Sequence, residues 1–479
     1  MLFNSSEYMA VFLPVVLLLC ILLRRFAGPR AAQGWILASS LFFYTWWKPA
    51  NLPYLIGSIL VNFAIAHAIT RAEQPVRKRL MQLGLVLNIG YLCLFKYVNF
   101  FLASLGSLLP HGFHLPDLDF PLGISFFTLL QIMYLVDVYE ELLPAMGLFD
   151  YSTFVSFFPY VISGPIARSK RMKHQFQDFG GKPEGKTLPD GHSGLVARGL
   201  FLFTMGLFKK VLLADAFAKV ANPGFAAYGH LSSLEAWVCS IAYTLQIYFD
   251  FSGYSDMAIG SALMLGIEIP RNFDAPLRAQ SIVEFWQRWH ISLSQFITTY
   301  LYTPMLKSMW RVSLVTSAIA TFFAMTIAGL WHGPAWTFVI YGVIHGCALA
   351  INQYWRKKKM PAVPAFPSWL LTFLVVDLAL LFFRSISLHA GGAMVRAMLN
   401  PHQPLAHATL SPAIAGLTAV NLAMLPLGIV LAFFGKSSDE LSREFKPTLA
   451  NALVTSAVFT GSCLFMAFNT SQSFLYFQF

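Results

Sequence analysis

The chain has 479 residues, of which 57% are hydrophobic and only 11% are charged. Soluble domains carry about 25% charged residues, so this composition excludes an ordinary soluble protein and indicates an integral membrane protein. The net charge of +11 could suggest a nucleic-acid ligand. The basic residues instead cluster in short segments between apolar runs: 24–30, 71–79, 168–173 and 356–359. This spacing is typical of cytoplasmic loops beside anionic lipid headgroups, so we expect membrane lipids and no nucleic acid as partners.

The apolar runs predict the architecture, because a membrane-spanning helix needs about 20 apolar residues. We predict spans near 9–24, 33–47, 53–70, 80–107, 120–138, 195–220, 233–251, 254–269, 312–331, 335–354, 368–386, 411–434 and 449–468. They predict an all-α integral membrane protein, a multispan helical bundle of about 11–13 spans plus re-entrant helices. No internal repeat is visible, and we expect 1–479 to form a single membrane domain.

The basic clusters also predict an orientation in the membrane. With the positive segments at 24–30, 71–79 and 357–359 on the inside, the N-terminus lies outside and HGFHLPDLD (111–119) lies outside. A further charged segment, KSSDELSREFK (436–446), is then inside, and the C-terminus is outside.

A short apolar segment, VSFFPYVISGPIARSK, interrupts the pattern of spans. It contains Pro159, Gly164 and Pro165 and suits a re-entrant segment better than a span, because irregular backbone at membrane depth must be buried in protein or line a cavity. The polar stretch at 174–194 follows it and is the largest candidate cytoplasmic loop. We treat 155–194 as one re-entrant segment with its loop.

An amphipathic segment occupies 271–304, where apolar and polar residues alternate at helical spacing. It suits a helix that lies at the membrane interface or lines a groove in the bundle. The predicted apolar side consists of Ile282, Phe285, Trp286, Trp289 and Leu293, and the polar side of Glu284, Gln287 and Arg288. Glu284 and Arg288 are four residues apart and are expected to form an ion pair. Trp286 and His290 have the same spacing and are expected to share a face.

The segment GLWHGPAWTFVIYGVIHG (329–346) contains two histidines in sequence that is otherwise fit for lipid. His332 precedes Gly333 and Pro334, and proline is favoured in the first turn of a helix. We predict that a helix begins near Pro334, with His332 just before its N-terminus, where the helix dipole and desolvation both disfavour the imidazolium. A neutral histidine at this position suits proton abstraction from a hydroxyl. The alternative for His332 is a structural hydrogen bond.

The other two candidate histidines have weaker signals. His345 lies thirteen positions after His332, about 20 Å along one continuous helix, and its small neighbours favour a helix–helix hydrogen bond. His290 ends the sequence EFWQRWH and is either a snorkelling interfacial residue or part of a site. No HxxxH or HxxE spacing supports a metal site built from these residues, so we expect no metal.

Two carboxylates occur in YFDFSGYSDMAIG (248–260). Asp250 and Asp256 flank a Ser252-Gly253 pair that we interpret as a break between two apolar helices. Paired carboxylates can relay protons, but aspartate and serine also cap helix ends, and we favour capping. No GxSxG elbow or nucleotide-binding loop is visible, so neither a serine hydrolase nor an ATP-driven pump is indicated.

Several motifs together resemble the membrane-bound O-acyltransferase (MBOAT) family. They are FLPVVLLL, FPYVISGPIAR, YFDFSGYSDMAIG, NFDAPLRAQSIVEFWQRWHISLS, LWHGPAWTFVIYGVIHG and FLYFQF, and they extend over nearly the whole chain. The resemblance is greatest to the bacterial branch that includes the alginate O-acetyltransferase and teichoic-acid D-alanyl-transfer membrane subunits. Alginate-type members usually continue with RDYLYIPLGGNR, whereas this chain reads TTYLYTPMLKSMWR (298–311) and lacks the Gly-Gly-Asn-Arg turn. The resemblance therefore does not identify the acceptor.

The resemblance implies a helical bundle around a tunnel that crosses the membrane, with re-entrant helices at its centre. An acyl donor, usually a thioester, enters from the cytoplasm, and a hydroxyl acceptor enters from the other side. The invariant histidine of the family's WHG motif matches His332, and a second polar position near RWHISLS matches His290. His345 matches a further histidine of this branch, to which we assign no role.

These observations predict an O-acetyltransferase of the bacterial inner membrane. Acetyl-CoA is the expected cytoplasmic donor, and the acceptor is a hydroxyl of an exported polysaccharide or of a periplasmic acetyltransferase partner. His332 is the expected general base, and His290 positions the donor or stabilises the oxyanion. The residues expected to contact the substrates are Trp331, Trp286, Arg288, Asp250, Ser252 and Asp256.

Two alternatives remain at this level. One is a D-alanyl or lipid O-acyltransferase that uses a carrier-bound donor. The other is a non-enzymatic transporter of polysaccharide or lipid, with His332 as a proton relay. Transporters often contain inverted repeats, and the absence of a visible repeat disfavours this alternative.

Overall fold

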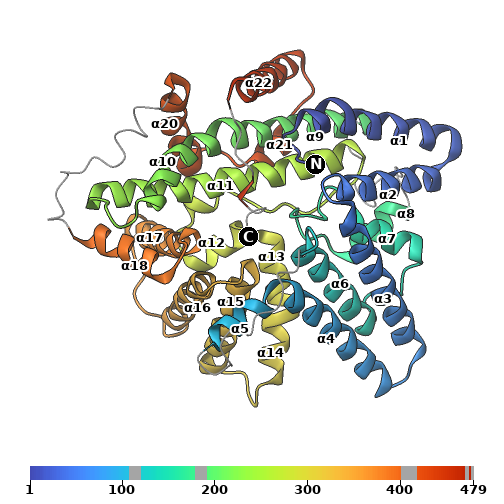
Figure 1. Ribbon diagram of the computed structural model, residues 1–479, viewed down its shortest axis with the longest axis horizontal. Helices are drawn as coiled ribbons and strands as arrows, with labels where there is room; N and C mark the ends of the chain where they lie inside the picture. The colour runs from blue at the N-terminus through green and yellow to red at the C-terminus, as the bar shows by residue number, and fades with distance from the viewer. Residues whose placement is uncertain (107–119, 178–190, 401–417, 470–473, 476–479) are drawn as a thin grey trace. The chain divides into compact units, whose positions relative to one another are not determined.

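The computed structural model describes residues 1–106, 120–177, 191–400, 418–469 and 474–475. These residues form helices and connecting segments without a strand among them, which confirms the all-α class (Figure 1). The predicted outer loop at 111–119, most of the loop at 174–194 and the start of the span at 411–434 lie outside the described residues.

The chain divides into two compact units. One comprises Met1–Phe203 with Met257–Pro270, and the other comprises Thr204–Asp256 with Arg271–Phe479. Two helices, α9 (Gly191–Phe208) and α11 (Ser233–Met264), run from one unit into the other. The single domain over 1–479 stays a prediction.

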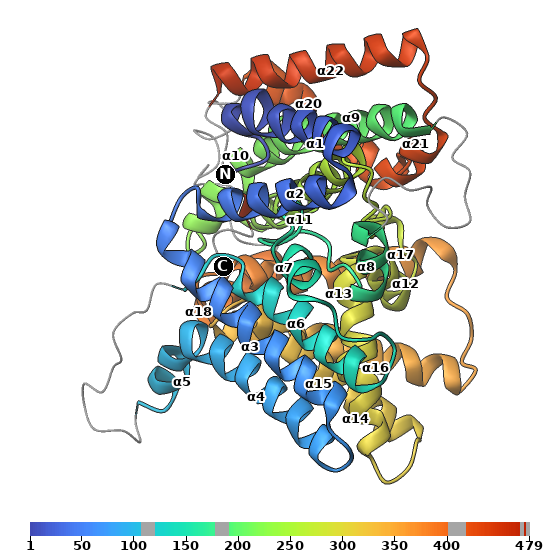
Figure 2. The ribbon, with the colours of Figure 1, turned by 90° about the vertical axis from the view of Figure 1, so that its right-hand side faces the viewer.

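The first unit contains the N-terminal helices. In chain order they are η1 (Tyr8–Phe12), α1 (Leu13–Ala27), α2 (Pro29–Thr45), η2 (Pro49–Asn51), α3 (Leu52–Arg71), α4 (Val76–Lys96), α5 (Val98–Ser104), α6 (Ile124–Tyr139), α7 (Leu148–Ser156) and α8 (Ser169–Gln177). Within this unit α3, α4 and α6 lie side by side (Figure 2). Their contact contains a buried polar cluster in which the Asn62 side chain donates to Asn88 Oδ1 at 3.2 Å and to Gln131 Oε1 at 2.9 Å. Such hydrogen bonds hold helices together where the surrounding solvent is lipid.

The second unit contains the remaining elements. After α9 these are η3 (Lys209–Ala214), α10 (Asp215–Ala226), α11, η4 (Pro276–Arg278), α12 (Ile282–Arg288), α13 (Ile291–Phe296), η5 (Ile297–Tyr302), α14 (Thr303–Ser308), α15 (Leu314–His332), α16 (Trp336–Lys357), α17 (Ala365–Arg384), α18 (Leu388–Leu399), α20 (Ala419–Phe434), α21 (Ser438–Glu444) and α22 (Leu449–Phe468).

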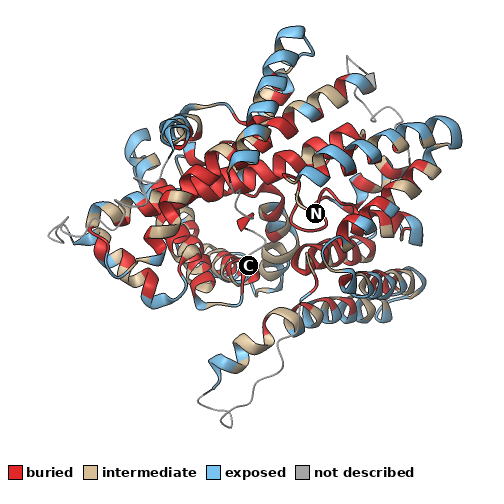
Figure 3. Cartoon of the chain, turned by 45° about the horizontal axis from the view of Figure 1, so that its top comes forward, coloured by how far each residue is buried: buried red, intermediate tan, exposed pale blue. Residues whose placement is uncertain are grey.

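Five helical segments among the described residues are long and apolar enough to cross a membrane. They are Tyr8–Ala27, Pro49–Arg71, Leu314–His332, Ala365–Arg384 and Leu449–Phe468. Two further pairs of helices, bent by 68° at α4–α5 and by 76° at α20–α21, raise the number to seven if each pair is one span. Many residues of these helices are exposed (pale blue in Figure 3), and large apolar residues are among them. In a membrane such side chains face lipid, and the multispan membrane class is confirmed.

The predicted spans at 233–251 and 254–269 belong to one helix, so the break predicted at Ser252-Gly253 is wrong. The 32 residues of α11 are continuous. Gly253 serves close packing instead, because a Cβ atom at this position would lie 2.7 Å from the carbonyl oxygen of Gly206. The α9–η3 backbone therefore approaches α11 directly at this glycine.

The segment that follows α7 has irregular backbone, as the proline and glycine residues in it suggested. Residues 157–168 contain turns but no helix, and nearly all of them are buried. This arrangement obeys the requirement that irregular backbone at membrane depth be enclosed by protein. Whether 155–194 is re-entrant stays a prediction.

The segment at 271–304 folds into several short helices, of which α12 matches the predicted pattern. Ser281 caps α12, with its hydroxyl oxygen accepting a hydrogen bond from the backbone N–H of Glu284 at 3.1 Å. The predicted apolar side is buried at all five positions. Glu284 and Arg288 form the expected ion pair at 2.9 Å.

Helices α15 and α16 form a closely packed hairpin in the second unit. Ser313 and Thr316 form a capping box that begins α15. Farther along, Gly329 of α15 faces Gly342 of α16, and a Cβ atom at Gly342 would lie 2.4 Å from the carbonyl oxygen of Met325. The two backbones can approach this closely only because these positions lack side chains.

We predict that Gly342→Val separates α15 from α16 and destabilises the protein. The added side chain meets backbone atoms that cannot rotate away, and overpacking of this kind costs about 1–3 kcal/mol. The unfolding temperature in detergent should fall. The matched control is Gly461→Val in α22, where a Cβ atom would meet no atom within 4 Å. Equal unfolding temperatures for the two variants would contradict the close contact.

Candidate active site

His332 precedes α16, as predicted, but it is also the last residue of α15, which the sequence did not predict. α15 runs through His332, a short turn follows at 333–335, and α16 begins at Trp336. The Gly-Pro pair ends one helix and precedes the next, and Pro334 lies in the turn rather than in the first helical turn. At a helix C-terminus the dipole favours the imidazolium, so the dipole argument for a neutral ring does not hold.

The surroundings of His332 are aromatic and largely dry. Its ring centroid lies 5.1 Å from Trp331, 5.1 Å from Phe383 and 5.8 Å from Tyr341. The residue is 7% exposed. These rings come from α15, α16 and α17, so three helices together position the histidine.

His345 lies much closer to His332 than one continuous helix would allow. The chain reverses direction between α15 and α16, and the ring of Tyr341 lies 4.7 Å from His345 and 5.8 Å from His332. The prediction of about 20 Å assumed one continuous helix, and it is wrong because of the turn at 333–335. Both histidines therefore contact one tyrosine.

His345 is completely buried and is bonded to α12. The indole N–H of Trp286 donates to His345 Nδ1 at 3.3 Å, and the ring of Phe285 is stacked on His345 at 6.0 Å. A helix–helix hydrogen bond was the favoured interpretation for His345, and the structure contains one.

His290 lies between α12 and α13 with φ at 42°, in the left-handed region. α12 ends at Arg288, so Trp286 and His290 do not share a helical face as predicted. The His290 ring instead packs on Phe251 at 4.7 Å and is 1% exposed. Burial lowers the pKa of His290 to about 3, so the ring is neutral at physiological pH.

Asp250 and Asp256 lie inside α11 and form ion pairs, so the favoured capping role is wrong. Lys209 Nζ lies 2.7 Å from Asp256 Oδ2, and Lys210 Nζ lies 2.7 Å from Asp250 Oδ1. Lys210 also contacts Asp215 Oδ1 at 3.0 Å. The lysines belong to η3, which Gly253 allows to approach α11.

The same charge cluster binds the last described residues of the chain. The backbone N–H of Leu475 donates to Asp250 Oδ2 at 3.0 Å, and Lys210 Nζ lies 4.9 Å from the ring centroid of Phe474. Ser252 is fully buried beside these aspartates on α11. The charges thus satisfy one another and the backbone, and contact of Asp250, Ser252 or Asp256 with a substrate stays a prediction.

The sequence did carry a signal for the lysines. Lys209 and Lys210 interrupt an apolar run, and an ionisable residue inside a membrane segment is a candidate for a partner or a function. Their partners on α11, Asp256 and Asp250, lie 47 and 40 residues away along the chain, at a separation that periodicity cannot reveal.

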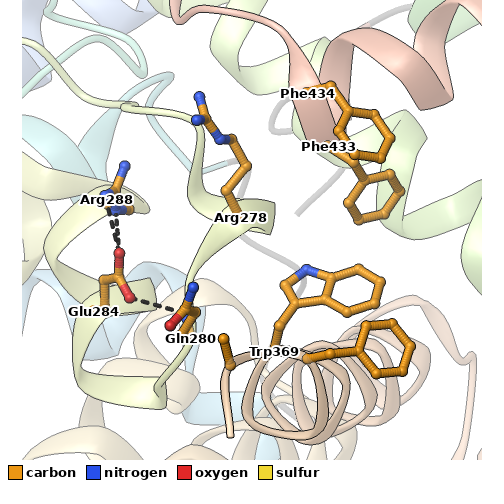
Figure 4. Close-up of a pocket in the computed structure, with 9 residues that line it drawn as sticks. Arg278, Gln280, Glu284, Arg288, Trp369, Phe433 and Phe434 are labelled. Carbon is orange, nitrogen blue, oxygen red and sulfur yellow. Dashed lines mark hydrogen bonds and ion pairs between the residues drawn. The ribbon is translucent and has the colours of Figure 1, made fainter.

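A separate cavity of about 530 Å³ lies in the second unit (Figure 4). Arg278, Gln280, Glu284 and Arg288 form one wall, and the aromatic side chains of α17 and α20 form the facing wall. The aromatic residues are Phe366, Trp369, Phe433 and Phe434. Hydrogen bonds hold the walls together, because the Trp369 indole N–H donates to the Leu277 carbonyl at 2.9 Å and the Arg278 guanidinium donates to the Gly435 carbonyl at 3.2 Å.

The cavity and His345 contact opposite faces of α12. Glu284 and Arg288 point into the cavity, whereas Trp286 points to His345. This short helix therefore presents polar side chains to the cavity and Trp286 to His345. The sequence identified Arg288 here but missed the aromatic wall, because α17 and α20 are distant in the chain.

Comparison with known proteins identifies the family. The sequence model of the membrane-bound O-acyltransferase family, MBOAT, matches residues 71–383, which include all three histidines. The chain belongs to this family. This MBOAT protein is thus an O-acyltransferase, and the family favours an enzyme over the transporter alternative.

Individual proteins of known name are similar to this chain over all or part of its length. It is 35% identical to the peptidoglycan O-acetyltransferase of Helicobacter pylori, over 100% of this chain and 98% of that protein. It is 37% identical to a probable alginate O-acetylase, AlgI, of Pseudomonas aeruginosa, over 91% of this chain and 81% of that protein. A teichoic acid D-alanyltransferase of Streptococcus thermophilus is 29% identical over 50% of this chain and 58% of its own length.

No group of three or more metal-ligating side chains occurs within the part of the chain that the structure describes. The expectation of a reaction without a metal stays a prediction.

We predict that Lys209→Met strongly destabilises the protein, because it leaves the Asp256 carboxylate buried without its cation. Breaking one partner of a buried pair costs about 3–5 kcal/mol. The double variant Lys209→Met, Asp256→Asn should recover much of that stability, since it removes both charges. Thermal unfolding in detergent measures both variants. A single variant as stable as the native chain would show that the pair is not buried from solvent.

Proposed function

We propose that this enzyme moves an acetyl group from acetyl-CoA on the cytoplasmic side of a bacterial inner membrane to a hydroxyl acceptor on the other side. The acceptor is an exported polysaccharide or a periplasmic acetyltransferase partner that completes the transfer. The names of the relatives, which include a peptidoglycan O-acetyltransferase and probable alginate O-acetylases, support an acetyl group and a polysaccharide. The observation that carries the proposal is the buried aromatic enclosure of His332 inside a family of O-acyltransferases.

The reaction needs one proton transfer at the acceptor. His332 takes the hydroxyl proton as the oxygen attacks the thioester carbonyl carbon, a carbon–oxygen bond forms, and the carbon–sulfur bond then breaks. The proton passes from His332 to the leaving sulfur, which gives the free thiol of CoA. Aromatic walls exclude water and so protect the thioester from hydrolysis. His290, a buried neutral ring, positions the donor or stabilises the developing oxyanion.

The cavity shown in Figure 4 suits the nucleotide end of the donor. Its volume of about 530 Å³ lies in the range of ligand sites. Arg278 and Arg288 supply guanidinium groups for phosphates. Glu284, which pairs with Arg288, is the only carboxylate among the lining residues. The aromatic wall offers flat surfaces for a base.

The location of the cavity agrees with a cytoplasmic donor. It lies where α17 begins and α20 ends, next to the basic segments at 356–359 and 436–446 that the positive-inside rule places in the cytoplasm. With this orientation the N- and C-termini lie outside.

We predict that His332→Gln strongly slows acetyl transfer while the protein still folds. General-base help is worth about 10²–10⁴-fold, so transfer of labelled acetyl from acetyl-CoA should fall by that factor in nanodiscs. Peptidoglycan fragments and alginate oligosaccharides serve as the two acceptor probes. His389→Gln, an exposed histidine of the same unit, is the matched control. Retained transfer in the His332 variant would show that His332 is not the general base. If the native chain used only a carrier-bound D-alanyl donor, the D-alanyltransferase alternative would be favoured over an acetyltransferase.

We predict that Arg278→Ala raises the KM for acetyl-CoA and leaves kcat unchanged, because the guanidinium contacts the part of the donor that does not react. An increase of about tenfold corresponds to one lost charge-assisted contact. The effect should shrink as salt is added. Arg443→Ala removes another partly exposed guanidinium, which pairs with Asp439 outside the cavity, and should leave KM unchanged. Equal KM values for the two variants would place the donor elsewhere.

A further inference from the structure

The protonation of His345 is fixed by its hydrogen bond to Trp286. An indole nitrogen can only donate, so the nitrogen that receives it at 3.3 Å, His345 Nδ1, must carry a lone pair. An imidazolium has a proton on both nitrogens and cannot accept this bond. His345 is therefore neutral, with its single proton on Nε2.

The Nε2–H group of His345 has no hydrogen-bond partner among the residues that the structure describes. The residue is 0% exposed, so this donor is buried. Buried donors are nearly always satisfied, and one that is not requires an explanation. The hydrogen bond that Nδ1 accepts from Trp286 already explains a structural role for His345. That role does not explain why the N–H group at Nε2 is buried without an acceptor in the described part of the chain.

The surroundings of His345 connect it to the proposed chemistry. Tyr341 contacts the rings of both His345 and His332, so the two histidines share one aromatic enclosure. Trp286, which fixes the ring, belongs to α12, whose opposite face lines the cavity assigned to the donor. His345 is thus linked to His332 through Tyr341 and to α12 through Trp286.

We propose that His345 Nε2–H is a fixed hydrogen-bond donor to the carbonyl oxygen of the acyl thioester. As the acceptor oxygen forms its bond to the carbonyl carbon, the C=O electrons move to that oxygen, and the Nε2–H bond stabilises the negative charge. The charge returns when the carbon–sulfur bond breaks, and His345 keeps its proton throughout. A donor oriented in advance costs no reorganisation at the moment of reaction. The inference rests on the proposed function of the same site.

The test replaces the donor group while leaving His332 in place. His345→Leu removes the N–H and should lower kcat about 10²–10³-fold. His345→Gln retains an N–H near the same position and should recover activity to within about tenfold of the native chain. Trp286→Phe removes the hydrogen bond to Nδ1, so the single proton of His345 can lie on either nitrogen. We therefore expect kcat to fall with little change in KM. Gln353→Leu removes another polar group from α16, one that bonds Thr321 at 2.9 Å, and serves as the control.

A binding measurement separates this role from packing. The first ligand is the ketone analogue of acetyl-CoA in which a methylene replaces the sulfur, and the second is S-ethyl-CoA, which lacks the carbonyl. His345→Leu should weaken binding of the ketone about tenfold and leave S-ethyl-CoA unaffected, since one hydrogen bond is lost. Equal weakening of both ligands, or a glutamine variant as impaired as the leucine variant, would assign His345 to packing.

The two proposals can fail separately. Native-like kinetics and binding in His345→Leu, with transfer intact in the native chain, would overturn the role of His345 and leave the proposed function standing. If the native chain binds neither analogue and transfers no acetyl group, the CoA thioester is not the donor, and the assigned role of His345 is overturned with it.

Discussion

The close contact between α15 and α16 determines where His332, the proposed general base, lies. Lipid offers no hydrophobic drive for helix association, so small residues that admit backbone contact decide which helices pair and in which register. Gly329 and Gly342 provide that contact, and the short turn at 333–335 follows from it. The register then places His332 against Tyr341, one turn before His345 on α16. A shift of the hairpin by one residue would rotate Tyr341 out of this enclosure.

The buried charges join η3 to α10 and α11. Lys210 and Asp250 fix η3 against α11, and Phe251, the next residue of α11, supports the ring of His290. Ion pairs of this kind seldom add net stability, because removing two charges from water is expensive. Their directional bonds do fix the rotation of a helix. We interpret the cluster as setting the face that α11 presents to His290.

The sequence predicted what depends on local pattern. Composition and apolar runs gave the all-α membrane class, and helical spacing gave the buried side of α12 and the Glu284–Arg288 pair. The failures all involve contacts between distant segments or the ends of short helices. Asp250 looked like a cap because its partner, Lys210, is forty residues upstream. The sequence did not place His332 in the last turn of α15, because Pro334 suits both a first helical turn and the turn before it.

The short helix α12 shows why the site needs these long-range contacts. Its seven residues cannot be stable alone, since isolated helices of this length are not populated in water. Its place is set by the Ser281 cap, by burial of Phe285 and by the bond from Trp286 to His345. The same bond fixes the tautomer of His345. If acetyl-CoA binds in the cavity beside α12 as proposed, this helix has two roles. It lines the polar wall at the nucleotide end of the donor, and through Trp286 it orients the Nε2–H of His345 that is proposed to bind the thioester carbonyl. Substitutions at Trp286 should then affect the chemical step rather than the affinity for the donor.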